Sequence, residues 1–258
     1  MMQRCLNITA IFNTVFENYF KTLYTRTMEE AYRHAHQEIL SALTDNGLCL
    51  DCGASSGHKF DFLQQEINFP LSQYSGIEWS SHLVKEGQNK GLNILQGDLN
   101  QKLPFPDNQY NCIFGLSVLE HLINPCHFLK ETHRCLKIDG TLVILTPNIS
   151  TFFTMALLLF GKMPSTGPHP DSDALLKQEE LFQVSPQGVQ HDTENDTPVH
   201  RHFIVFSYKV LRSYLQLLGF REIRGYGYGL YPFPNFTQNL LQKLDPWHCH
   251  QMVFTAKK

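Results

Sequence analysis

Short strand-like runs alternate with segments of helical spacing through the middle of this chain. The runs lie at residues 48–50, 74–78, 93–99, 110–114 and 141–145. Between them, apolar positions recur every three or four residues, as at Phe60, Leu63 and Ile67 and again from about Pro125 to Leu136. Because strands that alternate with helices form parallel sheets with helices on their faces, the pattern predicts an α/β fold.

The pattern divides the chain into four parts. Residues 47–148 hold the alternation and form the predicted core. Residues 1–46 are predicted to be a helical cap, because an apolar stripe from Tyr32 to Leu43 ends before a stop signal at Asn46-Gly47. Residues 149–206 are predicted to be an insertion or lid, and residues 207–258 to complete the core.

The last two parts contain further signals. An apolar stretch at 152–160 is followed by a polar, proline-rich part at 164–200. Ser207 is the expected N-cap of a helix that Gly219 ends. A strand at 220–224, an aromatic loop at 226–234 and a final strand at 251–256 are expected to follow.

One loop of the core has the composition of a nucleotide-binding turn. Asp51 ends the first strand-like run, and Gly53 and Gly57 frame the turn into the next helix. Glycine allows a tight turn, and the N–H groups at a helix start favour an anionic group such as a carboxylate. A dinucleotide fingerprint would need glycine at Ser55 and His58, so the spacing disfavours a nicotinamide dinucleotide.

Two further carboxylates follow later strands. Glu78 closes the second run, and Asp98 follows the third. Open α/β sheets bind ligands at the carboxyl ends of their strands, where an acid after the second strand commonly accepts hydrogen bonds from ribose hydroxyls. Exposed loop positions are the ordinary place for acids, but acids at three successive strand ends favour a binding site.

Together these segments resemble the class I S-adenosylmethionine-dependent methyltransferases. Asp-x-Gly-x-x-x-Gly at 51–57 resembles their first motif, and 117–122 resembles the Leu-Glu-His-Leu segment of the group that includes the ubiquinone-pathway O-methyltransferases. The resemblance covers residues 47–148 closely and returns after about residue 200. It implies a Rossmann-like, doubly wound sheet of seven strands with the last strand antiparallel, extended by N-terminal helices and a lid insertion after the fifth strand.

The resemblance also implies a cofactor site. S-Adenosylmethionine, which leaves as S-adenosylhomocysteine, would place its methionine carboxylate near the glycine loop, its ribose on Glu78 and its adenine beside Asp98 and Leu99. The complete set of expected cofactor-binding residues is Asp51, Gly53, Ala54, Ser55, Gly57, Glu78, Trp79, Asp98, Leu99 and Ser117.

Two histidines are the candidate catalytic residues. Methyl transfer from a sulfonium is an in-line displacement, so the protein supplies orientation, desolvation and in some enzymes a base. His121 follows the fourth strand and is placed to accept the proton of a hydroxyl or amine, and His202 approaches from the lid side. For each histidine, a purely structural hydrogen-bonding role is the alternative.

No metal is expected at this site. Some relatives hold a divalent cation with Glu-x-x-Glu-His, whereas here Ser117 replaces the first acid and leaves only Glu120 and His121. Such a pair lacks ligands unless the lid contributes one. Cys49 and Cys52 should point to opposite faces of the sheet, so their spacing does not indicate a zinc site.

Composition narrows the class of function. The 258-residue chain has a net charge of −3, and no basic cluster is longer than Lys257-Lys258, which disfavours a nucleic-acid partner. Seven scattered cysteines favour reduced thiols in the cytoplasm, and no targeting segment is expected. The apolar stretch at 152–160 is about half a membrane span. We therefore expect no segment that spans the membrane, and a peripheral membrane contact stays open as an alternative. The expected oligomeric state is a monomer or homodimer.

The expected function is methyl transfer from S-adenosylmethionine to a small-molecule acceptor. The resemblance favours O-methylation, and the aromatic residues between 226 and 236 favour a partly apolar or aromatic metabolite. The main alternative is a catalytically silent S-adenosylmethionine-binding module that acts through a partner protein. A nicotinamide oxidoreductase is a more distant alternative.

Overall fold

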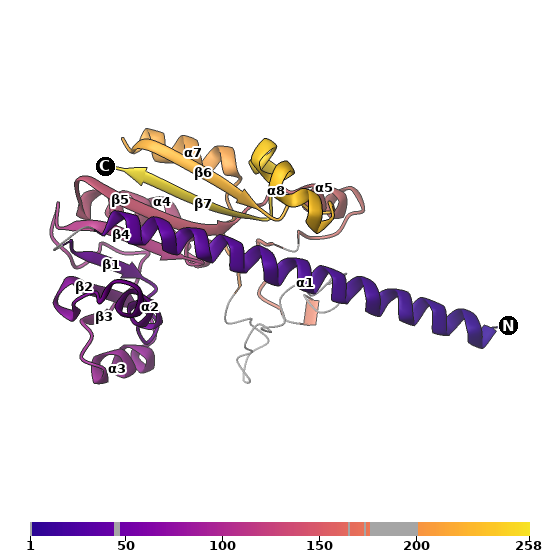
Figure 1. Ribbon diagram of the computed structural model, residues 1–258, viewed down its shortest axis with the longest axis horizontal. Coiled ribbons are helices and arrows are strands. Elements are labelled where there is room, and N and C mark those ends of the chain that lie inside the picture. The colour runs from indigo at the N-terminus through magenta and orange to yellow at the C-terminus, as the bar shows by residue number, and fades with distance from the viewer. Residues whose placement is uncertain (1, 44–46, 165, 173, 176–200) are drawn as a thin grey trace.

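A seven-stranded sheet forms the centre of the molecule (Figure 1). The computed structural model describes residues 2–43, 47–164, 166–172, 174–175 and 201–258, with the backbone alone for 2–18 and 20. The strand order is β3-β2-β1-β4-β5-β7-β6, and β7 runs antiparallel to both of its neighbours. The strands are β1 Cys49–Cys52, β2 Tyr74–Glu78, β3 Ile94–Gln96, β4 Tyr110–Leu116, β5 Leu136–Pro147, β6 Arg221–Tyr228 and β7 Gln251–Lys257. The predicted doubly wound fold with an antiparallel last strand is confirmed.

Helices cover both faces of the sheet. Buried residues of α4 and α7 pack on one face, and those of α1, α2 and α3 pack on the other. Cys52 belongs to the first of these two cores and Cys49 to the second, as their alternation along β1 predicts. The α-helices are α1 Met2–Ala42, α2 His58–Ile67, α3 Ser81–Asn89, α4 Pro125–Cys135, α5 Phe152–Leu159, α7 Tyr208–Leu217 and α8 Asn235–Leu244. Short 3₁₀ turns lie at η1 Leu71–Gln73, η2 Leu119–His121 and η3 Pro246–His248.

The N-terminal cap is one continuous helix within the described residues. α1 contacts β4, β5 and β7 across the face of the sheet, and its N-terminal half projects beyond the body (Figure 1). Its inward stripe includes Ala31, Ala35 and Ile39. The predicted stop at Asn46-Gly47 falls partly outside the described residues.

Helix caps follow the signals of the sequence. The Ser207 hydroxyl accepts a hydrogen bond from the Val210 N–H at the start of α7. Gly219, with φ of +91°, follows the end of that helix. Thr151 caps α5 in the same way, through the Thr154 N–H. These contacts satisfy N–H groups that have no partner within the helix.

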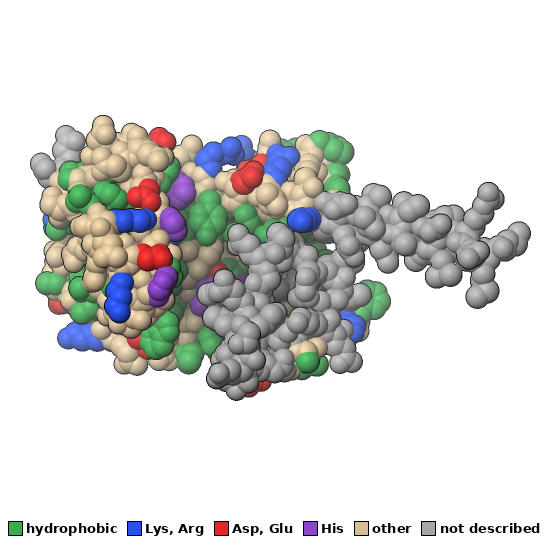
Figure 2. Space-filling view, turned by 90° about the horizontal axis from the view of Figure 1, so that it is seen from below, with side chains coloured by type: hydrophobic (Ala, Val, Ile, Leu, Met, Phe, Trp, Pro, Cys, Tyr) green, Lys and Arg blue, Asp and Glu red, His purple; other side chains and the backbone are tan. Residues whose placement is uncertain are grey.

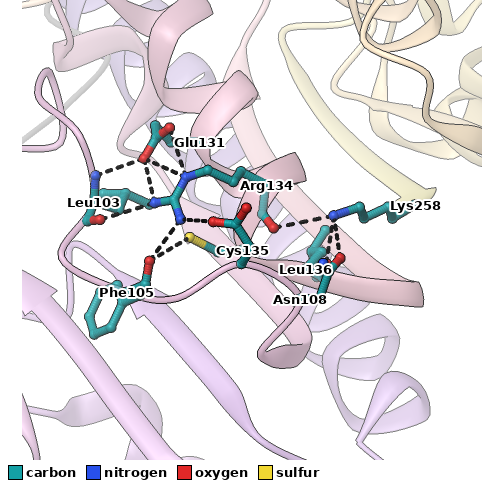
Figure 3. A network of polar contacts seen from close by, with 9 residues as sticks. Leu103, Phe105, Asn108, Glu131, Arg134, Cys135, Leu136 and Lys258 are labelled. Atoms are coloured by element: carbon teal, nitrogen blue, oxygen red, sulfur yellow. Dashed lines mark hydrogen bonds and ion pairs between the residues drawn. The ribbon is translucent and has the colours of Figure 1, made fainter.

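A polar network ties the loop before β4 to α4 and to the C-terminus (Figure 3). The Arg134 guanidinium contacts the carboxylates of Glu131 and Asp107 at 2.6 Å each and donates to the Leu103 and Phe105 carbonyls. Its hydrogen bonds lower the pKa of the Glu131 carboxyl. Because the network precedes β4, it lies at the end of the sheet away from the predicted ligand edge and serves the fold.

The C-terminal part differs from the prediction. The segment 226–234 was expected to be a loop, but β6 continues to Tyr228, and the helix α8 that follows was not predicted. β6 pairs with β7 over this length, which extends the strand beyond its own apolar pattern. The polar part of the predicted lid at 176–200 lies outside the described residues. Within the described residues, no helix is both long and apolar enough to cross a membrane.

Candidate functional site

The loop between β1 and α2 is held in left-handed backbone geometry. Gly53, Ser55 and Gly57 have φ values of +78°, +52° and +89°. A Cβ on Gly53 would lie 2.6 Å from Val118 Cγ2, so the glycine allows the loop after β4 to approach. Ser55 adopts this geometry without being glycine, which is the kind of strain that gathers at functional sites. Ala54, between them, is fully buried.

The Glu78 carboxylate links this loop to the end of β2. Its Oε2 accepts a hydrogen bond from the Ser55 N–H and its Oε1 accepts one from the Ser80 N–H, both at 2.9 Å. A carboxylate has about four lone-pair positions, so each oxygen can accept a second bond from a ribose hydroxyl. The chemistry of this carboxylate therefore fits the ribose of S-adenosylmethionine.

Asp51 lies in β1 just before the loop and contacts Lys59, which binds the loop. It is fully buried, its Oδ2 accepts a hydrogen bond from the Tyr74 hydroxyl, and its Oδ1 lies 3.5 Å from Lys59 Nζ. Burial raises the pKa of the Asp51 carboxyl. Lys59 also donates to the Gly53 carbonyl at 3.0 Å. Lys59 was not predicted as a site residue, although its position just after the motif is a signal for it.

Three further residues of the expected cofactor site, of which Asp98 and Leu99 were expected beside adenine, differ in their surroundings. Asp98 Oδ1 accepts bonds from the backbone and side-chain N–H groups of Asn100. Leu99 is buried and packs in the hydrophobic core, whereas Trp79 is 72% exposed. Asn100 Oδ1 in turn accepts from the N–H groups of residues 123 and 124. Asn100 thus joins the loops after β3 and β4, a role that no sequence motif indicated.

Ser117 brings α1 into the site. Its φ of +55° turns the chain sharply at the end of β4, and its hydroxyl oxygen accepts a 3.0 Å hydrogen bond from the Tyr32 hydroxyl. The apolar stripe of α1 included Tyr32 but gave no sign of this contact. The contact joins the N-terminal helix to the end of β4, beside the expected cofactor residues.

The two predicted catalytic histidines lie together. Their ring centroids are 4.9 Å apart, and His121 Nδ1 lies 3.1 Å from the Arg201 carbonyl oxygen. A carbonyl only accepts hydrogen bonds, so Nδ1 carries the proton and Nε2 carries the lone pair. Burial lowers the pKa of His121, and burial lowers that of His202 to about 3. Both rings are therefore neutral near pH 7.

Glu120 is a third titratable group beside these rings. Burial raises the pKa of its carboxyl to about 7, and its Oε2 accepts a 2.9 Å bond from the Thr146 hydroxyl. Its backbone carbonyl accepts from the Phe203 N–H at 2.8 Å, which anchors the segment that carries His202. The sequence indicated Glu120 only as one of a pair that was too small to hold a metal.

His202, on the lid side, is the additional ligand that Glu120 and His121 would need to hold a metal ion. Glu120, His121 and His202 each offer one ligand atom, and these atoms lie within 4.8 Å of one another. The Nδ1 atoms of both histidines face backbone carbonyls, that of His202 the Thr166 carbonyl at 2.6 Å. Figure 2 shows histidine side chains along the middle of one face of the molecule.

Comparison with known proteins agrees with this geometry. The sequence model of the family described as a methyltransferase domain matches residues 24–224, which is more than half of the chain. A probable S-adenosylmethionine-dependent methyltransferase of Mycobacterium tuberculosis is 24% identical over 137 residues, covering 51% of this chain and 48% of that protein. The mitochondrial ubiquinone biosynthesis O-methyltransferase of Dictyostelium discoideum is 26% identical over 140 residues, covering 54% of this chain and 37% of that protein.

The matches differ in how much they cover. The chain spans about half or less of the length of these curated relatives. Phosphoethanolamine N-methyltransferase 2 of Haemonchus contortus, solved in complex with S-adenosylmethionine, shares the fold with a TM-score of 0.55 and 12% identity over 86% of this chain and 52% of that chain. With the family match, the loop geometry and the sheet topology in agreement, the chain belongs to the methyltransferase-domain family of class I enzymes, whose cofactor is S-adenosylmethionine.

Proposed function

We propose that this chain transfers the methyl group of S-adenosylmethionine to a hydroxyl of a partly apolar or aromatic small molecule, with His121 as the base. The observation that carries the proposal is a neutral imidazole fixed at the carboxyl end of the sheet. The Arg201 carbonyl sets its tautomer, and burial keeps it unprotonated near pH 7. A neutral imidazole with a defined lone pair is suited to accept a hydroxyl proton.

The transfer balances around this base. Bound S-adenosylmethionine supplies an electrophilic methyl group. The methyl group would pass to the acceptor oxygen as S-adenosylhomocysteine leaves, and His121 Nε2 would take the hydroxyl proton and release it to solvent. Glu78 and the 53–57 loop would hold the cofactor in place, while burial around Glu120 and His202 limits water at the reacting atoms.

A buried aromatic cluster near these histidines makes this part of the molecule apolar, which supports a partly apolar acceptor. The His250 ring lies 5.6 Å from the Tyr24 ring and 5.2 Å from the Tyr231 ring, measured between centroids. His250 is close enough to His202 to contribute to the lowering of its pKa. Aromatic rings offer large apolar contact areas to planar acceptors. The name of the Dictyostelium relative favours an oxygen acceptor over nitrogen or carbon.

A product assay tests the proposal. The purified chain would be incubated with S-adenosylmethionine and a panel of phenols, carboxylic acids and amines of matched size, and S-adenosylhomocysteine would be quantified. We expect turnover with phenols, and a loss of about 10²-fold or more in His121→Ala with little change in cofactor affinity. His82→Ala is the matched control, because that side chain is 80% exposed on α3.

Two results would contradict the proposal. Equal turnover in His121→Ala and His82→Ala would show that His121 is not the base. It would favour an acceptor that is already nucleophilic. Tight cofactor binding without turnover on any acceptor would favour the silent module that acts through a partner.

A further inference from the structure

Two segments that are distant in sequence pair beside the histidines of the site. Residues 166–169 and residues 201–203 face each other, and three hydrogen bonds join them at His202. The His169 N–H donates to the His202 carbonyl at 2.9 Å, and the His202 N–H donates to His169 Nδ1 at 3.2 Å. His202 Nδ1 lies 2.6 Å from the Thr166 carbonyl oxygen. His202 is therefore held through its backbone and through its ring.

Gly167 allows this close pairing. Its φ is +90°, and a Cβ there would lie only 2.7 Å from His202 Cβ, so another residue would push the two segments apart. Gly161, which follows α5, has a φ of +68°, but a Cβ there would meet nothing within 4 Å. The two glycines share a left-handed backbone, and they differ in whether a side chain would press on His202.

The peptide that joins Arg201 to His202 connects two imidazole rings. Its carbonyl oxygen lies 3.1 Å from His121 Nδ1, and its N–H donates to His169 Nδ1. A trans peptide is planar, and its C=O and N–H bonds point in opposite directions. The hydrogen bond that fixes the N–H therefore also fixes the direction of the carbonyl, and the two rings lie on opposite sides of one rigid unit.

The next peptide repeats this arrangement with the roles reversed. Its N–H, that of Phe203, donates to the Glu120 carbonyl at 2.8 Å, and its carbonyl, that of His202, accepts from the His169 N–H. Two consecutive peptides thus bridge His169 on one side and the turn that carries His121 on the other. The second bridge uses the backbone of His169, whereas the first uses its side chain.

The first bridge defines where the ring protons lie. A carbonyl only accepts and a backbone N–H only donates, so His121 Nδ1 carries a proton and His169 Nδ1 carries a lone pair. Hydrogen bonds in such a chain polarise one another and become stronger. The His169 lone pair therefore makes the Arg201 carbonyl a better acceptor for His121.

We propose that His169 is a positioning residue, which orients the Arg201 carbonyl through the N–H of His202 and so keeps the proton of His121 on Nδ1. The lone pair of His121 then stays on Nε2, the atom that takes the acceptor proton in the proposed function. The inference rests on that function, and it assigns to His169 no contact with the acceptor.

Nitrogen NMR of the full chain, isotopically labelled at its histidines, tests the proposal because it distinguishes protonated from unprotonated ring nitrogens. The His121 signals are those that vanish in His121→Ala. We expect wild-type His121 to carry its proton on Nδ1 near pH 7. His169→Phe keeps a ring against His202, where the centroids are 4.9 Å apart, but removes the acceptor. This variant should lower the population of that tautomer and reduce kcat about fivefold, with little change in KM.

Three further variants separate positioning from general support of the fold. His169→Asn retains a side-chain acceptor and should restore both the tautomer and kcat. Gly167→Ala should disturb the His121 tautomer, because its Cβ would press on His202, whereas Gly161→Ala is the matched control and should not. Thermal unfolding of each variant shows what part of any effect is a loss of stability.

The outcomes for the positioning role and for the base role differ. An unchanged His121 tautomer in His169→Phe would overturn the positioning role, even if stability or turnover fell. Equal tautomer populations in Gly167→Ala and Gly161→Ala would overturn it too. A changed tautomer with unchanged turnover would support the positioning role and would contradict His121 as the base.

Discussion

The predicted cofactor side and the proposed acceptor side of this molecule are built from different kinds of contact. On the cofactor side, Glu78 at the end of one strand binds the Ser55 N–H in the loop after the neighbouring strand. On the acceptor side, His121 depends on the Arg201 carbonyl, and the Tyr231 hydroxyl donates to Thr27 across 204 positions of sequence. The first side follows from sheet topology, whereas the second depends on long-range packing.

The glycine loop should be the least tolerant part of the cofactor side. A Cβ on Gly57 would lie 2.1 Å from Leu92 Cδ1, and φ there is +89°. Gly57→Ala therefore combines overpacking with left-handed strain, and we expect a loss of roughly 2–4 kcal/mol in the free energy of unfolding. Urea unfolding measures this loss.

Gly91 separates the two causes of that loss. It has a φ of +83°, but a Cβ there would meet nothing within 4 Å. Gly91→Ala should cost only the backbone term, about 1–2 kcal/mol. Equal losses in the two variants would show that close packing against Leu92 does not constrain the loop.

The acceptor side should make the fold sensitive to acid. Burial lowers the pKa of His250 from its ordinary 6.5 to about 4. As pH falls from 6.5 to 4, the unfolded chain takes up a proton that the folded chain does not, so stability is lost. The loss from this residue is roughly 2 kcal/mol at pH 5.

A variant without the titrating group isolates this effect. His250→Phe keeps an aromatic ring between Tyr24 and Tyr231 and should remove that part of the pH dependence. Glu120 acts oppositely, because its pKa rises from 4.5 to about 7 and stability falls as pH rises between these values. The comparison of wild type with variant at pH 7 and pH 5 cancels the Glu120 contribution. Parallel pH profiles of the two proteins would refute the role of His250.

These differences explain which parts of the fold and of the candidate site could be predicted from the sequence. The positions of Asp51, Glu78 and Asp98 were predictable because each lies at or just after the end of a strand, and the strand order brings these ends to one edge of the sheet. Tyr32 and Asn100 were not predictable, because their hydrogen-bond partners are distant in sequence. The helix α8 was missed although its apolar residues have helical spacing. Its glutamines face inward and its apolar stripe faces solvent, so the usual pattern of a surface helix would have given the wrong buried face.

The tie between α1 and the end of β4 should have a smaller effect. Tyr32→Phe removes the hydroxyl that donates to Ser117 and keeps the ring. We expect a loss of about 0.5–1.5 kcal/mol in the free energy of unfolding, together with a modest fall in turnover. Equilibrium unfolding and the product assay measure the two effects. An unchanged value in both would show that α1 does not support the site through this contact.

Metal removal should have the smallest effect. Ser117 stands where some relatives have the first acid of their metal motif, and the Glu120 carboxylate accepts a hydrogen bond from the Thr146 hydroxyl, so we expect no resident cation. Treatment with a chelator followed by dialysis should leave turnover unchanged. Lost turnover that a divalent cation restores would show instead that Glu120, His121 and His202 act as a metal site.

Calorimetric titration of S-adenosylmethionine tests the central claim most directly. We expect saturable binding to the wild type, no binding of NAD under the same conditions, and binding to Glu78→Ala that is weaker by about 1–3 kcal/mol. Glu86→Ala, a partly exposed acid on α3, is the control and should bind as the wild type does. Wild-type affinity in Glu78→Ala, or binding of NAD in place of S-adenosylmethionine, would contradict the account.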